Sequence, residues 1–437
     1  MQLRQVLAAS LLGGAVSCGS VVYGPDANRD SNNTVDVATT SIQVKTLTHL
    51  GDGRPQAGTL VSTDAAGNLI AEAETGTAGT ATIAIVGGGN LHFIEPTTSG
   101  FHRITTIVGV QPGDALTFGM VQRPVQISGA AEAMAVTYPL LVNGTFYSFF
   151  TPCGVDASAR PSTLNLNADC HKLSFPLLGT AAFRGLTKFA FQQQTFVANG
   201  TAAITTWTDM SPFSILYSNT PANIDSLVAI RASVLSSRLV GFQTNTFGDP
   251  TQRDFTVDVQ FPPGVGTQSF VATELGRASM PGLQRVEVRT ATLSSSLAVD
   301  LAAQPLPWIA TAPVATATGA TWTVQETGTP DMRRSVWSGN WMQGPELQTL
   351  NWIVYDDSAS ATLSLPVLPA KFATVDPRAQ AVTNARAEVT YFDFSTLTGF
   401  ATLRLSAESL GAGFDNNAAL GNAAMVVRTS FAAAAPI

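Results

Sequence analysis

Charge is scarce in this chain of 437 residues, because Asp, Glu, Lys and Arg together make up 12% of the sequence. That share is about half of what an average soluble protein carries. The net charge is −7, and the only lysines are Lys45, Lys172, Lys188 and Lys371. A sequence without a basic patch has no electrostatic footprint for nucleic acid or for an anionic membrane surface. We therefore do not expect nucleic acid among its partners.

Catalytic motifs are lacking as well. The sequence has no G-x-S-x-G nucleophile motif, no H-E-x-x-H zinc motif and no phosphate-binding P-loop. It has four histidines, and only His92 and His102 are placed so that they could meet across a hairpin and bind a metal ion. Packed or exposed strand histidines are the favoured interpretation. We expect no catalytic residue, no metal site and no cofactor.

Cysteine is also rare, with three residues in the chain. Cys153 and Cys170 bracket a short loop, and in an oxidising compartment they are predicted to form a disulfide worth roughly 3 kcal/mol. Two buried free thiols are the alternative. No Cys-x-x-Cys or Cys/His spacing indicates zinc.

Long apolar runs are missing beyond the first residues of the chain. The run Val6–Val16 follows Arg4 and ends in small residues around Cys18. A charged start, a short apolar centre and small residues at the end are typical of a secretory signal peptide. The run is shorter than the roughly 20 apolar residues that span a bilayer. Residues 1–17 are therefore predicted to be a signal peptide, and any membrane attachment depends on Cys18.

The segment Val16-Ser17-Cys18-Gly19 resembles the lipobox of bacterial lipoproteins, although Ala15 stands where that family usually has Leu. The resemblance implies that Cys18 is acylated and becomes the mature N-terminus. Because no Asp follows Cys18, it also implies an outer-membrane or cell-surface location. Ala15 and Ser17 fit an ordinary signal-peptidase site too, which would leave a soluble secreted protein.

After a linker at residues 18–40, the sequence alternates polar and apolar residues with the period of β-strands. The clearest strand is Asp254–Phe261, whose apolar residues share one face. Leu283–Thr290 repeats the pattern, and Arg285, Glu287 and Arg289 are expected to point outward. Such strands predict half-buried antiparallel sheets. Ala401–Ala407 is also predicted to be a strand, whereas residues 223–236 are ambiguous and could form one short helix.

Residues 41–94 resemble the carboxypeptidase regulatory-like modules, which are Ig-like β-sandwiches. The pattern G-x-P-x-x-G, D-x-x-G-x and G-x-A-x-h falls at Gly53–Gly58, Asp64–Leu69 and Gly79–Ile83. The tract Ser148–Gly154 and the whole layout resemble predicted surface lipoproteins of bacteria. These resemblances imply a structural module that carries no catalytic residues.

Strands separated by Gly, Pro, Asn and Asp turns every 8–15 residues or so predict serial β-sandwiches. We therefore predict an all-β fold of tandem antiparallel, Ig-like β-sandwich domains. Their predicted ranges are 41–122 for the carboxypeptidase regulatory-like domain, 123–210 for a sandwich with the disulfide, 211–308 for a third sandwich and 309–437 for a C-terminal one.

Five of the six tryptophans lie between Trp308 and Trp352. Trp337 and Trp341 flank Ser338-Gly339-Asn340, which is predicted to be a hairpin turn. Flat rings beside polar side chains suit sugar or peptide binding. The favoured alternative is that the rings fill the core of the last sandwich, with Trp337 and Trp341 the most exposed of them.

Asp356 follows a predicted strand and could form a calcium turn or one half of the carboxylate pair of a glycosidase. The nearby carboxylates are Glu326, Asp331 and Glu346. A turn-forming Asp is favoured. The candidate ligand-binding residues are thus Trp337, Asn340, Trp341 and Asp356.

The sequence predicts a non-catalytic, lipid-anchored protein of the cell envelope or surface, with a structural, adhesive or ligand-binding role. Its expected partners are the membrane, through the anchor, and a polysaccharide or an envelope protein. A secreted hydrolase or a carbohydrate-binding protein built on the tryptophan-rich C-terminal domain is the alternative.

Overall fold

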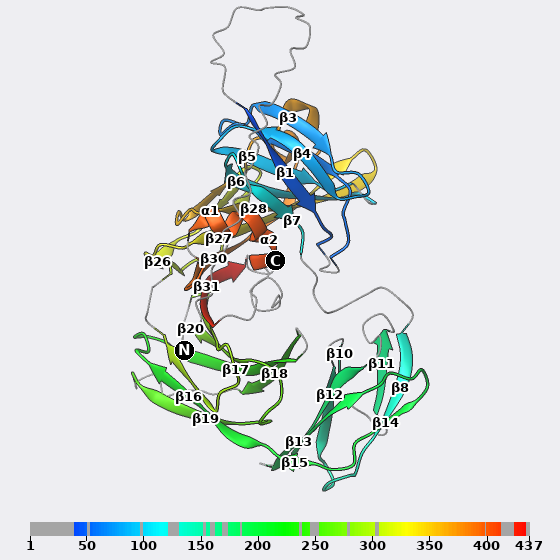
Figure 1. Ribbon diagram of the computed structural model, residues 1–437. Helices are drawn as coiled ribbons and strands as arrows, with labels where there is room; N and C mark the ends of the chain where they lie inside the picture. Colours follow the sequence, from blue (N-terminus) through cyan, green and yellow to red (C-terminus); the bar gives the residue numbers. More distant parts are fainter. Residues whose placement is uncertain are drawn as a thin grey trace, which may run out of the picture. The chain divides into compact units, whose positions relative to one another are not determined.

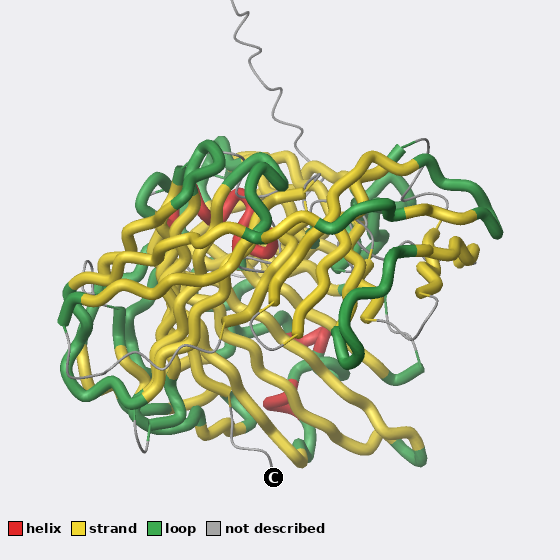
Figure 2. Tube along the Cα trace, turned by 90° about the horizontal axis from the view of Figure 1, so that it is seen from below, coloured by secondary structure: helices red, strands yellow, loops and turns green. Residues whose placement is uncertain are grey.

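Nearly every regular element of the protein is a β-strand, and the helical segments are short (Figure 2). The predicted all-β sandwich fold is confirmed. The computed structural model describes residues 39–49, 53–96, 99–120, 131–151, 154–157, 162–167, 174–183, 186–235, 238–244, 253–277, 280–301, 306–397, 399–411 and 424–433.

The largest element is a 12-stranded sheet. All neighbouring strands in it are antiparallel except one pair, β28 and β6. From one edge to the other its strands are β18 (Arg238–Thr244), β17 (Ser226–Leu235), β20 (Ser269–Gly276), β21 (Leu283–Arg289), β31 (Met425–Ala433), β30 (Thr383–Phe394), β27 (Met332–Gln343), β28 (Glu346–Asp356), β6 (Phe101–Val110), β5 (Gly89–Ile94), β2 (Thr59–Thr63) and β3 (Leu69–Glu74).

The parallel pairing of β28 with β6 joins distant parts of the chain (Figure 1). Its register runs from Thr349 opposite Phe101 to Tyr355 opposite Ile107. One sheet therefore contains strands from three predicted domains, 41–122, 211–308 and 309–437, and its hydrogen bonding continues from each of these segments to the next.

A second, smaller sheet packs on the strands between residues 59 and 110. It consists of β4 (Thr80–Ile85), β1 (Thr40–Thr46) and β7 (Ala115–Phe118), in that order. Ile42, Val44 and Ile83 from this sheet share one core with Leu91 and Phe93 of β5. The turn before β3 is built by Asp64, whose carboxylate accepts the backbone N–H groups of Ala66 and Asn68.

A third sheet, in the order β19 (Phe255–Phe261), β16 (Ser211–Ser218) and β22 (Ser296–Asp300), packs near β20 and β21. The predicted alternation in β19 is confirmed, since Val257, Val259 and Phe261 are buried and the residues between them are exposed.

The expected outward face of β21 is wrong. Glu287 is 2% exposed and Arg289 is 3% exposed, so both faces of the strand are covered. These charges tolerate burial because Glu287 lies between two arginines on the same face, 3.1 Å from Arg285 and 3.7 Å from Arg289.

Residues 131–209 form two sheets around a core of their own, with Tyr147, Phe149 and Leu177 among its buried residues. One sheet has the order β10 (Gly154–Ala157), β9 (Phe146–Thr151), β12 (Phe175–Phe183), β13 (Leu186–Gln194) and β15 (Thr208–Asp209). The other has the order β11 (Ser162–Asn167), β8 (Ala131–Thr137) and β14 (Thr201–Ala203).

Short elements cover the tryptophan-rich face of β27, β28 and β30. They are β23 (Trp308–Ile309), β24 (Val314–Thr316), β25 (Gly319–Thr321), β26 (Val324–Glu326), β29 (Thr362–Ser364) and the 3-10 helices η2 (Ala370–Phe372) and η3 (Pro377–Ala379).

The predicted strand at Ala401–Ala407 is wrong, because this segment is helical. It comprises α1 (Phe400–Leu403), the 3-10 helix η4 (Arg404–Ser406) and α2 (Ala407–Leu410). The buried residues Phe400, Leu403, Ala407 and Leu410 follow the spacing of a helix face. The possible helix within residues 223–236 is wrong in the opposite sense, since Ser226–Leu235 is β17.

The predicted turn at Ser338-Gly339-Asn340 is wrong as well, since β27 runs through it and the chain turns at Gly344, where φ is +62°. The register of β27 with β30 shifts between Ser338 and Asn340. A Cβ on Gly339 would lie 2.6 Å from the Trp337 ring. The glycine therefore marks a bulge with close packing, and no turn.

Candidate functional site

Trp337 and Trp341 are buried, with 0% and 1% of their surface exposed. Alternation along β27 turns both rings to the covered face, where they pack in one cluster with Leu350 and Trp352. The Trp337 indole N–H donates to the carbonyl of Thr316 at 2.8 Å. The expectation that these two rings are the most exposed is wrong, and the core interpretation is confirmed.

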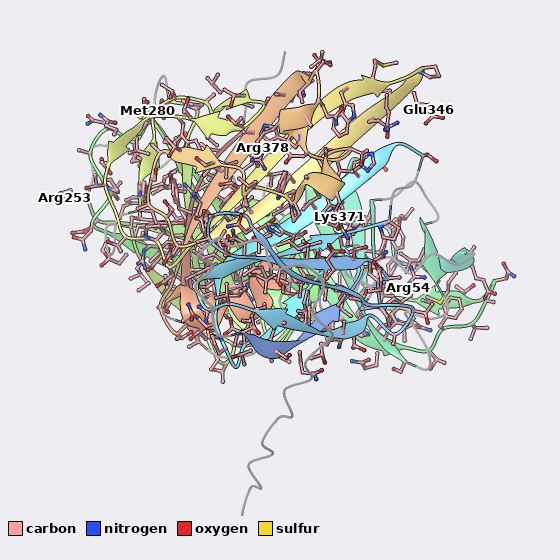
Figure 3. All side chains as sticks on the ribbon, turned by 90° about the horizontal axis from the view of Figure 1, so that it is seen from above. Arg54, Arg253, Met280, Glu346, Lys371 and Arg378 are labelled. Atoms are coloured by element: carbon pink, nitrogen blue, oxygen red, sulfur yellow. The ribbon has the colours of Figure 1, made fainter. Side chains whose placement is uncertain are left out.

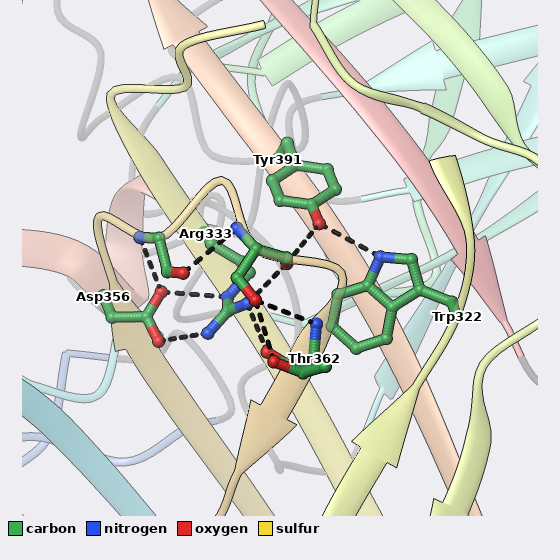
Figure 4. A network of polar contacts seen from close by, with 7 residues as sticks. Trp322, Arg333, Asp356, Thr362 and Tyr391 are labelled. Carbon is green, nitrogen blue, oxygen red and sulfur yellow. Dashed lines mark hydrogen bonds and ion pairs between the residues drawn. The ribbon is translucent and has the colours of Figure 1, made fainter. Parts of the chain in front are cut away.

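Asp356 ends β28 in an ion pair with Arg333 (Figure 4). Arg333 Nε donates to Asp356 Oδ1 at 2.9 Å and Nη2 donates to Oδ2 at 2.6 Å. The backbone N–H of Ser358 also donates to Oδ1, at 3.0 Å. Burial raises the pKa of the Asp356 carboxyl, and the Arg333 guanidinium acts in the opposite direction. Both carboxylate oxygens are thus engaged in contacts within the protein.

Arg333 also holds the loop that follows β28. Its Nη1 donates to the carbonyls of Ser360 at 2.9 Å and Thr362 at 2.7 Å. The Tyr391 hydroxyl donates to the same Ser360 carbonyl and accepts the Trp322 indole N–H at 3.0 Å (Figure 4). Asp356 therefore belongs to a network that joins β27, β28, β29 and β30, which fits the favoured turn-forming role.

The carboxylates named as partners for Asp356 make their contacts elsewhere. Glu326 pairs with Arg277 at 2.7 Å. Asp331 accepts the backbone N–H groups of Phe394 and Gly399. Glu346 is exposed at the outer end of the β27–β28 hairpin (Figure 3). The described contacts bring none of these three carboxylates to Asp356, where the hydrolase alternative requires one of them.

Replacing Arg333 by lysine should lower the free energy of unfolding by about 2 kcal/mol, because lysine keeps the charge but loses the bidentate contact and a carbonyl contact. Urea unfolding followed by circular dichroism measures this. Arg386→Lys on the neighbouring strand is the matched control, since Arg386 is exposed and its replacement should cost less than about 0.5 kcal/mol. Equal losses in both variants would contradict the role given to Arg333.

Asn340 is the candidate ligand residue that borders an open pocket. The pocket has a volume of about 460 Å³ and is lined by Ser338, Gly339, Asn340, Thr349, Asn384 and Arg386. Asn384 adopts a φ of +52° at the register shift between β27 and β30. Amide, hydroxyl and guanidinium groups together can donate and accept hydrogen bonds, which suits a hydroxylated ligand.

His92 and His102 occupy separate environments. The ring of His92 is fully buried and contacts the Thr106 hydroxyl at 2.9 Å. His102 contacts Gln348 at 2.9 Å and stacks on Trp341, with ring centroids 5.8 Å apart. Among the described residues, no group of three or more His, Cys, Asp and Glu side chains could hold a metal ion.

The predictions for Cys18, Cys153 and Cys170 fall outside the described residues. Acylation of Cys18 and the Cys153–Cys170 disulfide therefore stay predictions. In the part of the chain that the structure describes, no helix has the length and apolar character needed to cross a membrane.

Sequence reasoning missed a pocket lined by Arg277, Arg285 and Arg428. Arg277 directly follows β20 and Arg285 lies in the next strand, β21, whereas Arg428 lies in β31, which is far away in the sequence. The only local signal is the run of charged residues in β21, unusual in a chain with so little charge.

No protein-family model matches the sequence, and no curated protein matches it.

Proposed function

We propose that this chain is a non-catalytic protein of the bacterial cell envelope, anchored to the outer membrane by lipid on Cys18, with a structural or adhesive role. The anchor is supported by the lipobox-like segment at Val16–Gly19. A polysaccharide or another envelope protein would be its partner.

The observation that carries the structural role is the use of buried charges to tie distant segments together. Arg103 on β6 pairs with Glu408 on α2 at 2.7 Å. Arg404 on η4 makes a bidentate pair with Asp114, at 2.8 and 2.9 Å. These pairs fasten the helical segment near the C-terminus to the N-terminal strands. Buried pairs of this kind favour one arrangement of the segments, because each charge becomes costly without its partner.

The linker sets how far this framework would stand from the membrane. Residues 19–38 separate Cys18 from the first described residue, Thr39. A chain of that length reaches at most about 70 Å. An acylated Cys18 would thus keep the β framework within that distance of the lipid surface, where an adhesive or structural protein acts.

Detergent partitioning tests the anchor. The wild-type protein, expressed with its N-terminal segment in a bacterial host, should enter the detergent phase, and Cys18→Ser should stay in the aqueous phase, because several acyl chains on one cysteine hold a protein firmly in lipid. Cys153→Ser is the control and should partition like the wild type. Intact mass of the mature chain should show an acylated N-terminal Cys18. An unmodified Cys18, or cleavage at another position, would remove the anchor from the proposal.

A further inference from the structure

A pocket of about 240 Å³ lies beside β21 and β31. Three guanidinium groups line it, from Arg277, Arg285 and Arg428, together with a single carboxylate, Glu326. Its apolar wall includes Leu306 and Trp308. The volume is near the lower limit of small-molecule sites, so the pocket suits a small ligand.

Buried donors in this pocket lack acceptors. Arg277 Nε, Arg428 Nε and the Trp308 indole N–H have no hydrogen-bond partner among the described residues. Trp308 is 0% exposed, and the two arginines are each 9% exposed. A buried donor that finds no acceptor costs free energy, and native proteins leave few of them. Three such donors belong to residues that line one pocket, so the described residues leave the polar groups around it incompletely satisfied.

Contacts with acidic and aromatic side chains hold the arginines of the pocket in place. Arg277 pairs with Glu326 at 2.7 Å and stacks on Trp308, with its guanidinium carbon 3.9 Å from the ring centroid. Arg285 contacts Glu274 and Glu287, at 3.3 and 3.1 Å.

Arg428 makes the longest ion-pair contact of the three arginines. Its contact with Asp393 is long, at 3.7 Å, and its Nη2 reaches the Asp300 carbonyl at 3.5 Å. Burial lowers the pKa of the Arg428 guanidinium in spite of these acidic neighbours. An anion beside Arg428 would offset that cost, because a charged partner stabilises a buried cation.

We propose that this pocket binds a small organic acid, with its carboxylate between Arg277 and Arg428 and its carbon skeleton against the apolar residues of the lining. A planar carboxylate matches the fork of a guanidinium in two parallel hydrogen bonds. The apolar wall selects a carbon skeleton over a bare inorganic ion. This site is independent of the anchor at Cys18.

Titration calorimetry at constant ionic strength tests the proposal with three probes: glucuronate, benzoate and inorganic phosphate. At least one carboxylate should bind saturably to the wild-type protein, and more tightly than phosphate. Glucuronate binding without benzoate binding would identify a hydroxylated acid, and the reverse an apolar one. No saturable binding of either carboxylate up to about 10 mM, or tighter binding of phosphate, would overturn the proposal.

Single substitutions of arginine test whether the ligand binds in this pocket. Arg277→Gln and Arg428→Gln should each weaken binding about tenfold or more, since each removes a charged hydrogen-bond donor. Arg253→Gln is the matched control, because Arg253 is exposed and does not line the pocket, and its affinity should stay within about twofold.

Glu326→Gln provides a readout that does not depend on removing a buried arginine. Glu326 has a side chain 42% exposed, so its replacement by an isosteric amide should leave the fold intact. It removes the one carboxylate that lines the pocket and competes for Arg277, so carboxylate binding should tighten about threefold. Unchanged or weaker binding in Glu326→Gln would contradict the placement of the ligand at Arg277.

Discussion

Glu408→Ala is expected to lower the free energy of unfolding by about 3–5 kcal/mol, the cost of removing one partner of a buried ion pair. Glu408 is 3% exposed; its carboxylate accepts from Arg103 at 2.7 Å and from the backbone N–H of Gly119 at 2.5 Å. Burial alone would lower the pKa of Arg103, but Glu408 and Glu95 outweigh it and raise that pKa. The alanine variant leaves both donors without this acceptor.

Urea unfolding of the wild type and four variants, Glu408→Ala, Arg103→Met, their double variant and Glu72→Ala, measures this effect. Glu72→Ala is the control, because Glu72 pairs with the exposed Lys371 and its loss should cost less than about 1 kcal/mol. The double variant of Glu408→Ala and Arg103→Met should be more stable than the sum of the single losses predicts, since it removes the buried guanidinium that Glu408→Ala leaves with Glu95 as its one paired carboxylate. Additive losses would show that Glu408 and Arg103 do not depend on each other.

Local alternation was enough to predict individual strands. In β19 Val257, Val259 and Phe261 are buried and Phe255 is half-buried, as the pattern requires, and the all-β fold follows from such strands. The two-residue alternation predicts the wrong element where the chain is helical. Residues 400–410 contain Leu403 and Leu405 two apart, which resembles a strand, yet the burial of Leu403, Ala407 and Leu410 shows a helical face.

Pairings between distant segments could not be predicted, because nothing local encodes them. The parallel contact of β28 with β6 extends the sheet across the predicted domain ranges. Other elements pack on both faces of this sheet, and this packing determines which candidate residues are buried. Trp337 is buried beneath β24, and Glu287 is buried although its strand pattern places it on a polar face. A pattern within one strand shows which residues share a face, but not whether that face meets water.

The pocket lined by Arg277, Arg285 and Arg428 could not be predicted from the sequence for the same reason. Arg277 and Arg428 meet only because β20, β21 and β31 are neighbours in the sheet. Asn340 was found through a local motif, although the motif was assigned to a turn and the residue lies within β27. Its half-buried position beside a polar pocket comes from the register shift with β30.

Acid is expected to destabilise the protein through His92, by about 3 kcal/mol between pH 7.5 and pH 4. His92 is 0% exposed, with its ring nitrogens near the hydroxyls of Thr106 and Thr63, at 2.9 and 3.3 Å. Burial, aided by the positive charge of Arg378, lowers the pKa of His92 to about 3 from 6.5. Above pH 6.5 the ring is neutral in both the folded and the unfolded chain. Between pH 6.5 and pH 3 the unfolded chain binds a proton that the folded chain does not, so stability falls as the pH falls.

His92→Gln isolates this effect, because glutamine can still donate to and accept from the two threonine hydroxyls but does not titrate. The free energy of unfolding of both proteins is measured by urea unfolding at pH 7.5 and at pH 4. Carboxylates titrate alike in the two proteins, so their contribution cancels in the difference. The variant should be less stable than the wild type at pH 7.5, since glutamine fits the histidine site imperfectly. The difference in free energy of unfolding should shift by about 3 kcal/mol in favour of the variant at pH 4, because the neutral buried imidazole destabilises the wild type at that pH. A difference that is constant with pH would mean that the pKa of His92 in the folded protein is close to its value in the unfolded chain, which would contradict the prediction.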